Sequence, residues 1–423
     1  MMSLTSFSGL GKSTWLILSL VFLLSCNRAQ SGTEQTLDYD AGRDYFPDKV
    51  SLQYAKNFSV SYHKNYKVVR TNAQLSSWEG NGEEAKEDIV VLVQRGTPAP
   101  ALTGDLKDAT IIQIPAKRVA VNIQNGEVFL NELGLSDNIV AVGGAVSYDD
   151  SIREKVINQE LAQVGYSWHR PANMEVLLEE KVDLFLMNLS NLDFAEVLDR
   201  SRQLGIPATP VFEWSEGNYL ARAEWIKFYS LFFNAEARAD SVFNEIVEQV
   251  EEIRALTSTI NVNDKPTMIW GYYSGDDRWI VHRNSIEAQF MRDIGVLNIL
   301  EDFSRPVRNE GESISSEELL TTARNASHWM IGDIHSESLP SENYMKNFNS
   351  WSSGRLYHNM KRSKPEANAF DWYGRAIVRP DLILADMTKL IYPEIDLDHK
   401  LYFMDHFDKS MKLPPETSQS FYN

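Results

Sequence analysis

Residues 235–256 read AEARADSVFNEIVEQVEEIRAL, and apolar side chains recur among them at the spacing of one helix face. The residues of this face are Val242, Phe243, Ile246, Val247, Val250 and Ile253. At 1.5 Å per residue such a helix spans roughly 30 Å, about the diameter of a small domain. We therefore predict one long, stiff helix near the middle of the chain that connects two halves of the fold.

A second helix is predicted immediately before the long one. Trp225, Phe228, Tyr229 and Phe232 follow the i, i+3, i+4, i+7 spacing of a single buried stripe. Asn234 follows this stripe, and we expect it to break the helix, because asparagine is common where helices end. The two helices together form a helical region between the halves.

Strands and helices alternate on both sides of this helical region. The apolar strand patterns that precede it lie at 118–121, 138–142, 182–187 and 208–212, with helical patterns between them. After a polar loop at 261–266 the same rhythm restarts with a strand at 267–270. Such alternation is typical of a parallel sheet with helices on both faces. The predicted fold class is therefore α/β, with two doubly wound α/β lobes joined by one long α-helix.

The segment before this alternation has a different pattern. Residues 58–62 and 66–70 alternate on either side of Asn65, as the strands of a hairpin do, and residues 88–93 read as a more buried strand. We therefore expect N-terminal β-hairpin additions to the first lobe, and the sequence leaves the role of residues 51–108 open. The predicted parts of the chain are a signal peptide at 1–25, a flexible tether at 26–50, an N-terminal lobe at 51–217, a helical region at 218–258, a C-terminal lobe at 259–410 and a tail at 411–423.

Cys26 is the single cysteine of the 423 residues, and it ends an apolar run at 15–25 that follows Lys12. The run is too short for a membrane-spanning helix and is typical of a secretory signal. Its end, LLSC at 23–26, resembles the lipobox of bacterial lipoproteins, in which the cysteine is acylated. We expect Cys26 to be lipidated and the protein to be held in the cell envelope, on a periplasmic or extracytoplasmic face. The alternative is an ordinary signal peptide with an incidental cysteine.

The chain is acidic, with a formal net charge of −18. That charge argues against binding to nucleic acid, whose phosphates would repel it. It also argues against adsorption on anionic lipid, so the membrane contact we expect is the lipid anchor alone. With one cysteine, the chain forms no internal disulfide.

Several segments, in their order and spacing, resemble the substrate-binding proteins of ABC importers for iron–siderophores, haem and vitamin B12. The segments are 115–121, 131–143, 164–175 with 181–184, 285–299, 316–320 and 371–385. Val182 stands where that family usually has proline. The resemblance covers residues from about 109 to 395 and implies a class III periplasmic binding protein-like fold, in which a single long helix bridges the lobes.

The resemblance also implies a function. It predicts a lipid-anchored protein that captures an iron chelate (siderophore or haem) or a corrinoid and delivers it to an ABC permease with its ATPase. It implies no enzymatic activity, no cofactor and no resident metal. The ligand among these classes is left open.

Two glutamates match the positions that dock onto permease arginines in that family, one in each lobe: Glu175 and Glu317. Each follows a helix-capping residue, Asn173 or Ser315. Acidic residues in a first helical turn also stabilise the helix by about 0.3–1 kcal/mol, so a purely structural role is the alternative. Under that alternative, Glu318 would complete a capping box.

A ligand cleft is expected between the lobes, because crevices outside strand ends bind ligands in open α/β sheets. Loops at 122–125 and 147–148 face it from the first lobe. The ligand-binding residues that we predict are Trp168, Arg170, Tyr148, Tyr273, Trp279, Asp371, Trp372 and Arg375. Aromatic faces suit a flat ring system, and arginines bind carboxylates in bidentate fashion.

Part of that set comes from the resemblance. Trp168, Asp371 and Arg375 match ligand contacts of the B12-binding relative, and Trp279 matches an aromatic contact there. A second tryptophan of that relative aligns with Asn188, and a third falls near Gly311, which disfavours B12 itself.

Other chemistries have weaker support in the sequence. His169 and His282 are the histidines nearest the expected cleft, and either could ligate haem iron. The spacing of the histidines gives no paired metal site. Two further hypotheses stay open: a surface-anchored enzyme acting on glycans or cell-wall material, and a haem scavenger without a transporter.

Overall fold

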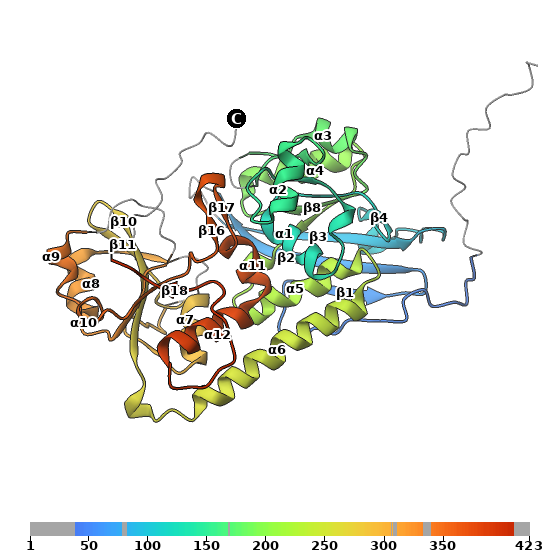
Figure 1. Cartoon of the computed structure of the whole chain (residues 1–423). Coiled ribbons are helices and arrows are strands. Elements are labelled where there is room, and N and C mark those ends of the chain that lie inside the picture. Colours follow the sequence, from blue (N-terminus) through green and yellow to red (C-terminus); the bar gives the residue numbers. More distant parts are fainter. Residues whose placement is uncertain are drawn as a thin grey trace, which may run out of the picture.

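The computed structural model describes residues 39–77, 83–167, 170–305, 307, 311–332 and 340–409. The predicted signal peptide, Cys26, the start of the tether and the predicted tail at 411–423 lie outside these residues. Figure 1 shows two lobes and an N-terminal sheet arranged along one long helix, α6 (Glu236–Ser258). The prediction of two α/β lobes joined by a long helix is confirmed.

The N-terminal sheet has four strands in the order β1-β2-β3-β4. The strands are β1 (Phe58–Tyr62), β2 (Tyr66–Ser76), β3 (Glu83–Gln94) and β4 (Thr110–Ile114). β1 and β2 pair antiparallel, which confirms the predicted hairpin, and β3 pairs antiparallel with β2 and parallel with β4. Phe58 of this sheet packs edge-on against Trp225, with ring centroids 4.9 Å apart. The N-terminal sheet therefore packs on the helical region.

The first lobe is a parallel sheet of five strands in the order β7-β6-β5-β8-β9. The strands are β5 (Val119–Val121), β6 (Ile139–Val142), β7 (Ala162–Gln163), β8 (Leu184–Asn188) and β9 (Ala208–Val211). The helices are α1 (Gln124–Glu132), α2 (Asp150–Ile157), α3 (Met174–Glu179) and α4 (Ala195–Gln203). The chain adds strands to one side of β5 and then to the other, so the topological switch point lies at β5.

Two helices link the lobes. α5 (Tyr219–Leu231) is buried on almost every side, and α6 buries the predicted face, with Val247 only partly covered. Asn234 separates them with a left-handed backbone (φ 55°), a conformation that asparagine tolerates better than most residues. At the far end of α6, Arg254 pairs with Asp293 of the second lobe at 2.7 Å.

The second lobe has a mixed sheet in the order β13-β11-β10-β14-β15-β18, with β12 also paired to β10. The strands are β10 (Thr267–Gly275), β11 (Arg278–Val281), β12 (Leu297–Asn298), β13 (Glu312–Ser315), β14 (His328–Met330), β15 (Leu356–His358) and β18 (Asp405–His406). β12, β10, β14 and β15 run parallel, whereas β11, β13 and β18 pair antiparallel. The alternation pattern does not reveal these antiparallel strands. Asp276 and Asp277, both at positive φ, form the tight turn of the β10–β11 hairpin.

Helices and one small hairpin complete the second lobe. The helices are α7 (Ile286–Asp293), α8 (Ser316–Ala323), α9 (Glu342–Met345), α10 (Asn349–Ser353), α11 (Trp372–Val378) and α12 (Pro380–Ile391). β16 (Ser363–Lys364) and β17 (Ala369–Phe370) form the hairpin. α12 packs against α6, and α11 packs against α5 and against α1 of the first lobe, so the second lobe contacts both linking helices and the first lobe.

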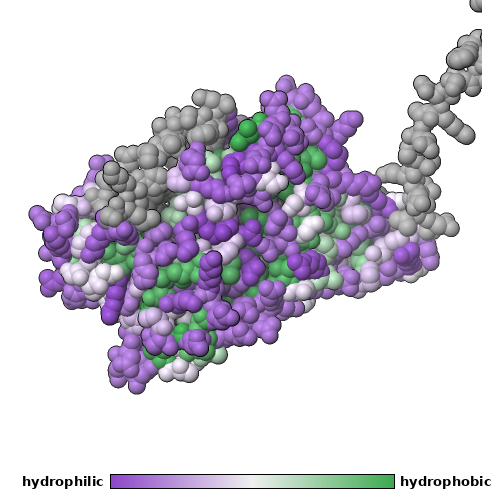
Figure 2. All heavy atoms as spheres, in the orientation of Figure 1, coloured by the Kyte–Doolittle hydropathy of each residue, from purple (hydrophilic) through white to green (hydrophobic). Residues whose placement is uncertain are grey.

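Hydrophilic residues dominate the face drawn in Figure 2, and hydrophobic residues reach the surface mainly toward the middle of the molecule, where the lobes and linking helices meet. Within the described ranges, no helix combines the length and apolar composition needed to cross a bilayer.

Candidate ligand-binding cavity

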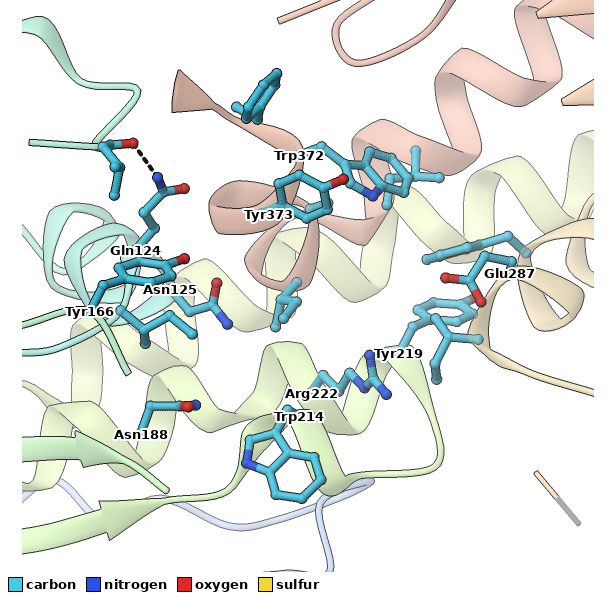
Figure 3. Close-up of a pocket in the computed structure, with 18 of the residues that line it drawn as sticks. Gln124, Asn125, Tyr166, Asn188, Trp214, Tyr219, Arg222, Glu287, Trp372 and Tyr373 are labelled. Atoms are coloured by element: carbon cyan, nitrogen blue, oxygen red, sulfur yellow. Dashed lines mark hydrogen bonds between the residues drawn. The ribbon is translucent and has the colours of Figure 1, made fainter. Parts of the chain in front are cut away.

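A cavity of about 640 Å³ lies between the two lobes. Its first-lobe lining includes Gln124 and Asn125 after β5, Asn188 at the end of β8, Tyr166, and Trp214 after β9. These positions follow the carboxyl ends of strands on both sides of the switch point, which is where open α/β sheets bind ligands. In Figure 3, they face residues of α5, α7 and α11 across the cavity.

The second-lobe side of the cavity is largely aromatic. Phe290, Phe370, Trp372 and Tyr373 line it. Trp372 packs at 6.3 Å from the buried ring of Trp270, measured between ring centroids, and edge-on to Phe403 at 5.7 Å. Phe290 stacks on Tyr219 at 4.6 Å. Because packing holds these rings from behind, the aromatic wall is preformed.

Arg222 of α5 supplies a positive charge within the cavity lining. Its Nε donates a hydrogen bond to the Glu216 carbonyl at 3.1 Å. Figure 3 shows its guanidinium directed toward the side of the cavity that holds Tyr219 and Glu287. Burial lowers the pKa of Arg222, and the carboxylates of Glu287, Glu213 and Glu216 oppose that shift.

Glu287 supplies the negative charge of the lining. Its Oε2 lies 2.9 Å from His282 Nδ1 and accepts a hydrogen bond from the Ser285 hydroxyl at 2.6 Å. Burial opposes ionisation of this carboxyl. The charge and hydrogen bond of His282, with hydrogen bonds from Ser285 and from the residue's own backbone, outweigh burial and lower the pKa of Glu287 to about 2.

Polar atoms without partners lie beside Arg222. Asn125 donates through Nδ2 to Glu213 Oε1 at 3.3 Å. Among the described residues, no partner exists for Asn125 Oδ1, Glu213 Oε2 or Trp214 Nε1, all of which are buried. Burial raises the pKa of the fully enclosed Glu213 above its usual value. Such unpaired atoms are costly unless something else binds them.

A second, smaller cavity of about 260 Å³ adjoins the first, sharing Gln124. Basic side chains of the second lobe reach across this smaller cavity to acidic residues of the first lobe. Lys364 lies 2.7 Å from Asp150 and donates to the Tyr148 carbonyl at 3.0 Å, while Arg375 pairs with Glu132. These contacts bridge the lobes.

The structure distributes the predicted ligand-binding residues unevenly. Trp372 lines the main cavity, whereas Tyr148, Asp371 and Arg375 line the smaller one, where Arg375 bridges the lobes. Arg170 is exposed and lines neither cavity. Trp168, like His169, lies outside the described residues.

Tyr273 and Trp279 require a correction, because the structure places neither of them at the two cavities. Trp279 is fully buried in the second-lobe core, 5.1 Å from the ring of Trp329, and donates through Nε1 to the Ser316 hydroxyl at 3.1 Å. Tyr273 packs on it at 5.3 Å. Trp279 belongs to the core of the second lobe, and Tyr273 packs against that core.

Glu175 and Glu317 are both exposed in the first turns of α3 and α8. Asn173 caps α3 by accepting from the backbone N–H of Glu175 at 2.9 Å, and Ser315 caps α8 by accepting from that of Glu318 at 3.1 Å. The Glu318 carboxylate pairs with Arg283.

Several residues of the cavity escaped the sequence prediction, among them Tyr219, Arg222 and Glu287. A signal was available for Arg222. The helix that carries it is apolar around most of its surface, and a charged residue inside such a helix marks a buried polar site. His282, which the sequence offers as a candidate haem ligand, is buried and lies 2.9 Å from Glu287, so it holds that carboxylate in place. Within the described ranges, no three His, Cys, Asp or Glu side chains converge as a metal site requires.

The sequence profile of a family described as "Periplasmic binding protein" matches residues 125–357. An uncharacterised lipoprotein of Methanocaldococcus jannaschii is 24% identical over 330 residues, which cover 74% of this chain and 79% of that protein. A second uncharacterised lipoprotein of the same organism is 21% identical over 376 residues, covering 83% and 84%.

Among solved structures, a TroA-like periplasmic binding protein from Xylanimonas cellulosilytica is similar, with a TM-score of 0.53 and 16% identity. The alignment covers 77% of this chain and 99% of that one. At this level of identity the likeness concerns the fold.

Proposed function

The chain belongs to the periplasmic binding protein family, and we propose from this premise that it is the lipid-anchored substrate-binding protein of an ABC importer. Its ligand would be an iron chelate (siderophore or haem) or a corrinoid, which it delivers to a permease and its ATPase outside the cytoplasm. The LLSC sequence at 23–26 and the lipoprotein names of two relatives support the anchor.

The observation that carries this proposal is the cavity between the lobes. Its volume of about 640 Å³ falls in the range of small-molecule sites, roughly 300–1,000 Å³. One wall is aromatic and preformed, and the rest of the lining carries amides and one arginine. A flat ring system with a polar rim would bury apolar area on the first and hydrogen-bond to the second.

Binding can be tested by quenching of tryptophan fluorescence. The purified protein is titrated with haem, cobalamin and ferric siderophores, and we expect saturable quenching by at least one of them. Absence of binding to every member of this panel would contradict the proposal.

The side chain of Trp372 offers the sharpest variant for this assay. We expect Trp372→Ala to weaken binding of the best probe at least tenfold, because the exposed ring face is lost. Trp372→Phe is the matched control and should stay within about threefold, since it keeps an aromatic face. Because the fluorophore itself changes, calorimetry measures the affinity. Equal affinities for the alanine and phenylalanine variants would exclude a stacking role for this residue.

Delivery to a permease predicts a separate role for Glu175 and Glu317. Reversing both charges, Glu175→Lys with Glu317→Lys, should reduce ligand uptake by cells at least tenfold and leave the affinity for ligand within twofold, because complementary charges orient docking. Uptake of a labelled ligand and calorimetry of the purified variant measure the two effects.

A charge-matched control uses exposed glutamates of α6, away from α3 and α8: Glu248→Lys with Glu252→Lys. This control should transport normally. Undiminished uptake by the Glu175/Glu317 variant would contradict docking through these residues.

A further inference from the structure

We infer that the ligand of the main cavity is electrically neutral and carries amide-like hydrogen-bonding groups, so that the site excludes strongly anionic chelates. This inference rests on the proposed function and narrows its ligand class. Two independent features of the lining carry it: the balance of charge around Arg222, and the unpaired polar atoms of Asn125 and Trp214.

The positive charge of Arg222 is already compensated. Carboxylates of Glu213, Glu216 and Glu287 act on it electrostatically, and its Nε is engaged by the Glu216 carbonyl. Glu287 also lines the cavity, so the lining holds one cation and one anion. An incoming carboxylate or catecholate would compete with these acids for a single guanidinium.

The carboxylates are fixed in place by other partners. Glu216 Oε1 accepts from the backbone N–H groups of Lys56 and Asn57, both at 2.9 Å, and from Trp225 Nε1 at 3.1 Å. Glu287 is held by His282 and Ser285. These acids therefore stay in place when a ligand enters. Their negative charges still act on Arg222 in the bound state.

Burying a net anion in such a site is unfavourable. A ferric triscatecholate carries about three negative charges, and burial would remove them from water without a cation to compensate them. A neutral ligand avoids this cost.

The unpaired atoms define which neutral groups fit. Asn125 Oδ1 needs a hydrogen-bond donor and Trp214 Nε1 needs an acceptor, and neither atom has a partner among the described residues. A carboxamide or hydroxamate-type group offers an acceptor, and a primary amide offers both functions. Satisfying these atoms requires a ligand with such groups on its rim and a shift of the side chains that cover the atoms.

The experiment compares probes of different charge on the full-length, detergent-solubilised protein. The neutral probes are cyanocobalamin and a ferric trihydroxamate; the anionic probes are a ferric triscatecholate and haem with its two propionates. We expect a neutral probe to bind at least 100-fold more tightly than either anionic probe. Equal or tighter binding of an anionic probe would overturn the inference while upholding the proposed function, whereas no binding of any probe would remove both.

Two further measurements test the electrostatic cause. Glu287→Gln removes the negative charge of the lining and should raise the affinity for the triscatecholate, relative to the affinity for the neutral probe, at least fivefold. Glu248→Gln, on the exposed side of α6, is the matched control and should change neither.

The second measurement needs no variant, so it holds even if Glu287→Gln fails to fold. For the wild-type protein, the dissociation constant of the best probe should change less than twofold between 50 and 500 mM NaCl, because no net charge is paired on binding. A tenfold weakening with salt would overturn the inference.

Discussion

Replacing Glu224 by alanine is expected to lower the free energy of unfolding by about 3–5 kcal/mol, because the substitution removes one partner of a buried lysine and leaves several backbone donors unpaired. The Glu224 carboxylate is fully buried and accepts from the backbone N–H groups of Gln53, Tyr54 and Ala55 at 2.7–3.1 Å. The same carboxylate lies 3.0 Å from Lys227 Nζ, which is itself 1% exposed.

Urea unfolding followed by circular dichroism measures this loss. Glu248→Ala is the matched control, because Glu248 lies on the exposed side of α6, and its effect should stay within about 0.5 kcal/mol. A change of less than 1 kcal/mol for Glu224→Ala would mean that water or rearrangement satisfies the abandoned donors.

Buried contacts of this kind give the N-terminal segment a structural role. Glu216 binds the backbone of residues 56 and 57, and Lys67 of β2 pairs with Glu236 at the start of α6. The N-terminal sheet is therefore attached to both linking helices through buried charges. Because Glu216 also holds Arg222, this attachment extends to the wall of the cavity.

Periodicity in the sequence was sufficient to predict much of the fold. The apolar face of α6, the break at Asn234 and the first hairpin all depend on neighbouring residues, so a local pattern reveals them. The antiparallel strands of the second lobe are different, because strand direction depends on how distant segments pair. The separation of the N-terminal sheet from the first-lobe sheet depends on pairing in the same way.

The cavity was only partly predictable for a related reason. The loops at 122–125 follow a parallel strand, and fold topology alone places them at the crevice. An aromatic residue suits a core as well as a cleft, so the sequence could not tell Trp372, which lines the cavity, from Trp279, which is buried. An arginine such as Arg375 can form an ion pair between the lobes or contact a ligand, and the sequence does not distinguish these two roles.

Removing the interlobe cations is expected to speed ligand release about 5- to 30-fold. Exposed ion pairs contribute about 0.2–1 kcal/mol each, and the partly buried Arg375–Glu132 pair more, so losing two costs about 1–2 kcal/mol, at 1.4 kcal/mol per factor of ten. The variant is Lys364→Met with Arg375→Met. Asp150 and Glu132 keep contacts with Arg153 and Arg379, respectively, so neither acid is left isolated.

Stopped-flow displacement of the best-bound probe measures the release rate. Lys361→Met is the matched control, since Lys361 pairs with Asp405 at 2.6 Å within the second lobe, and it should release the probe at the wild-type rate. An unchanged release rate in the double variant would show that the lobes separate, or the ligand leaves, without breaking these contacts.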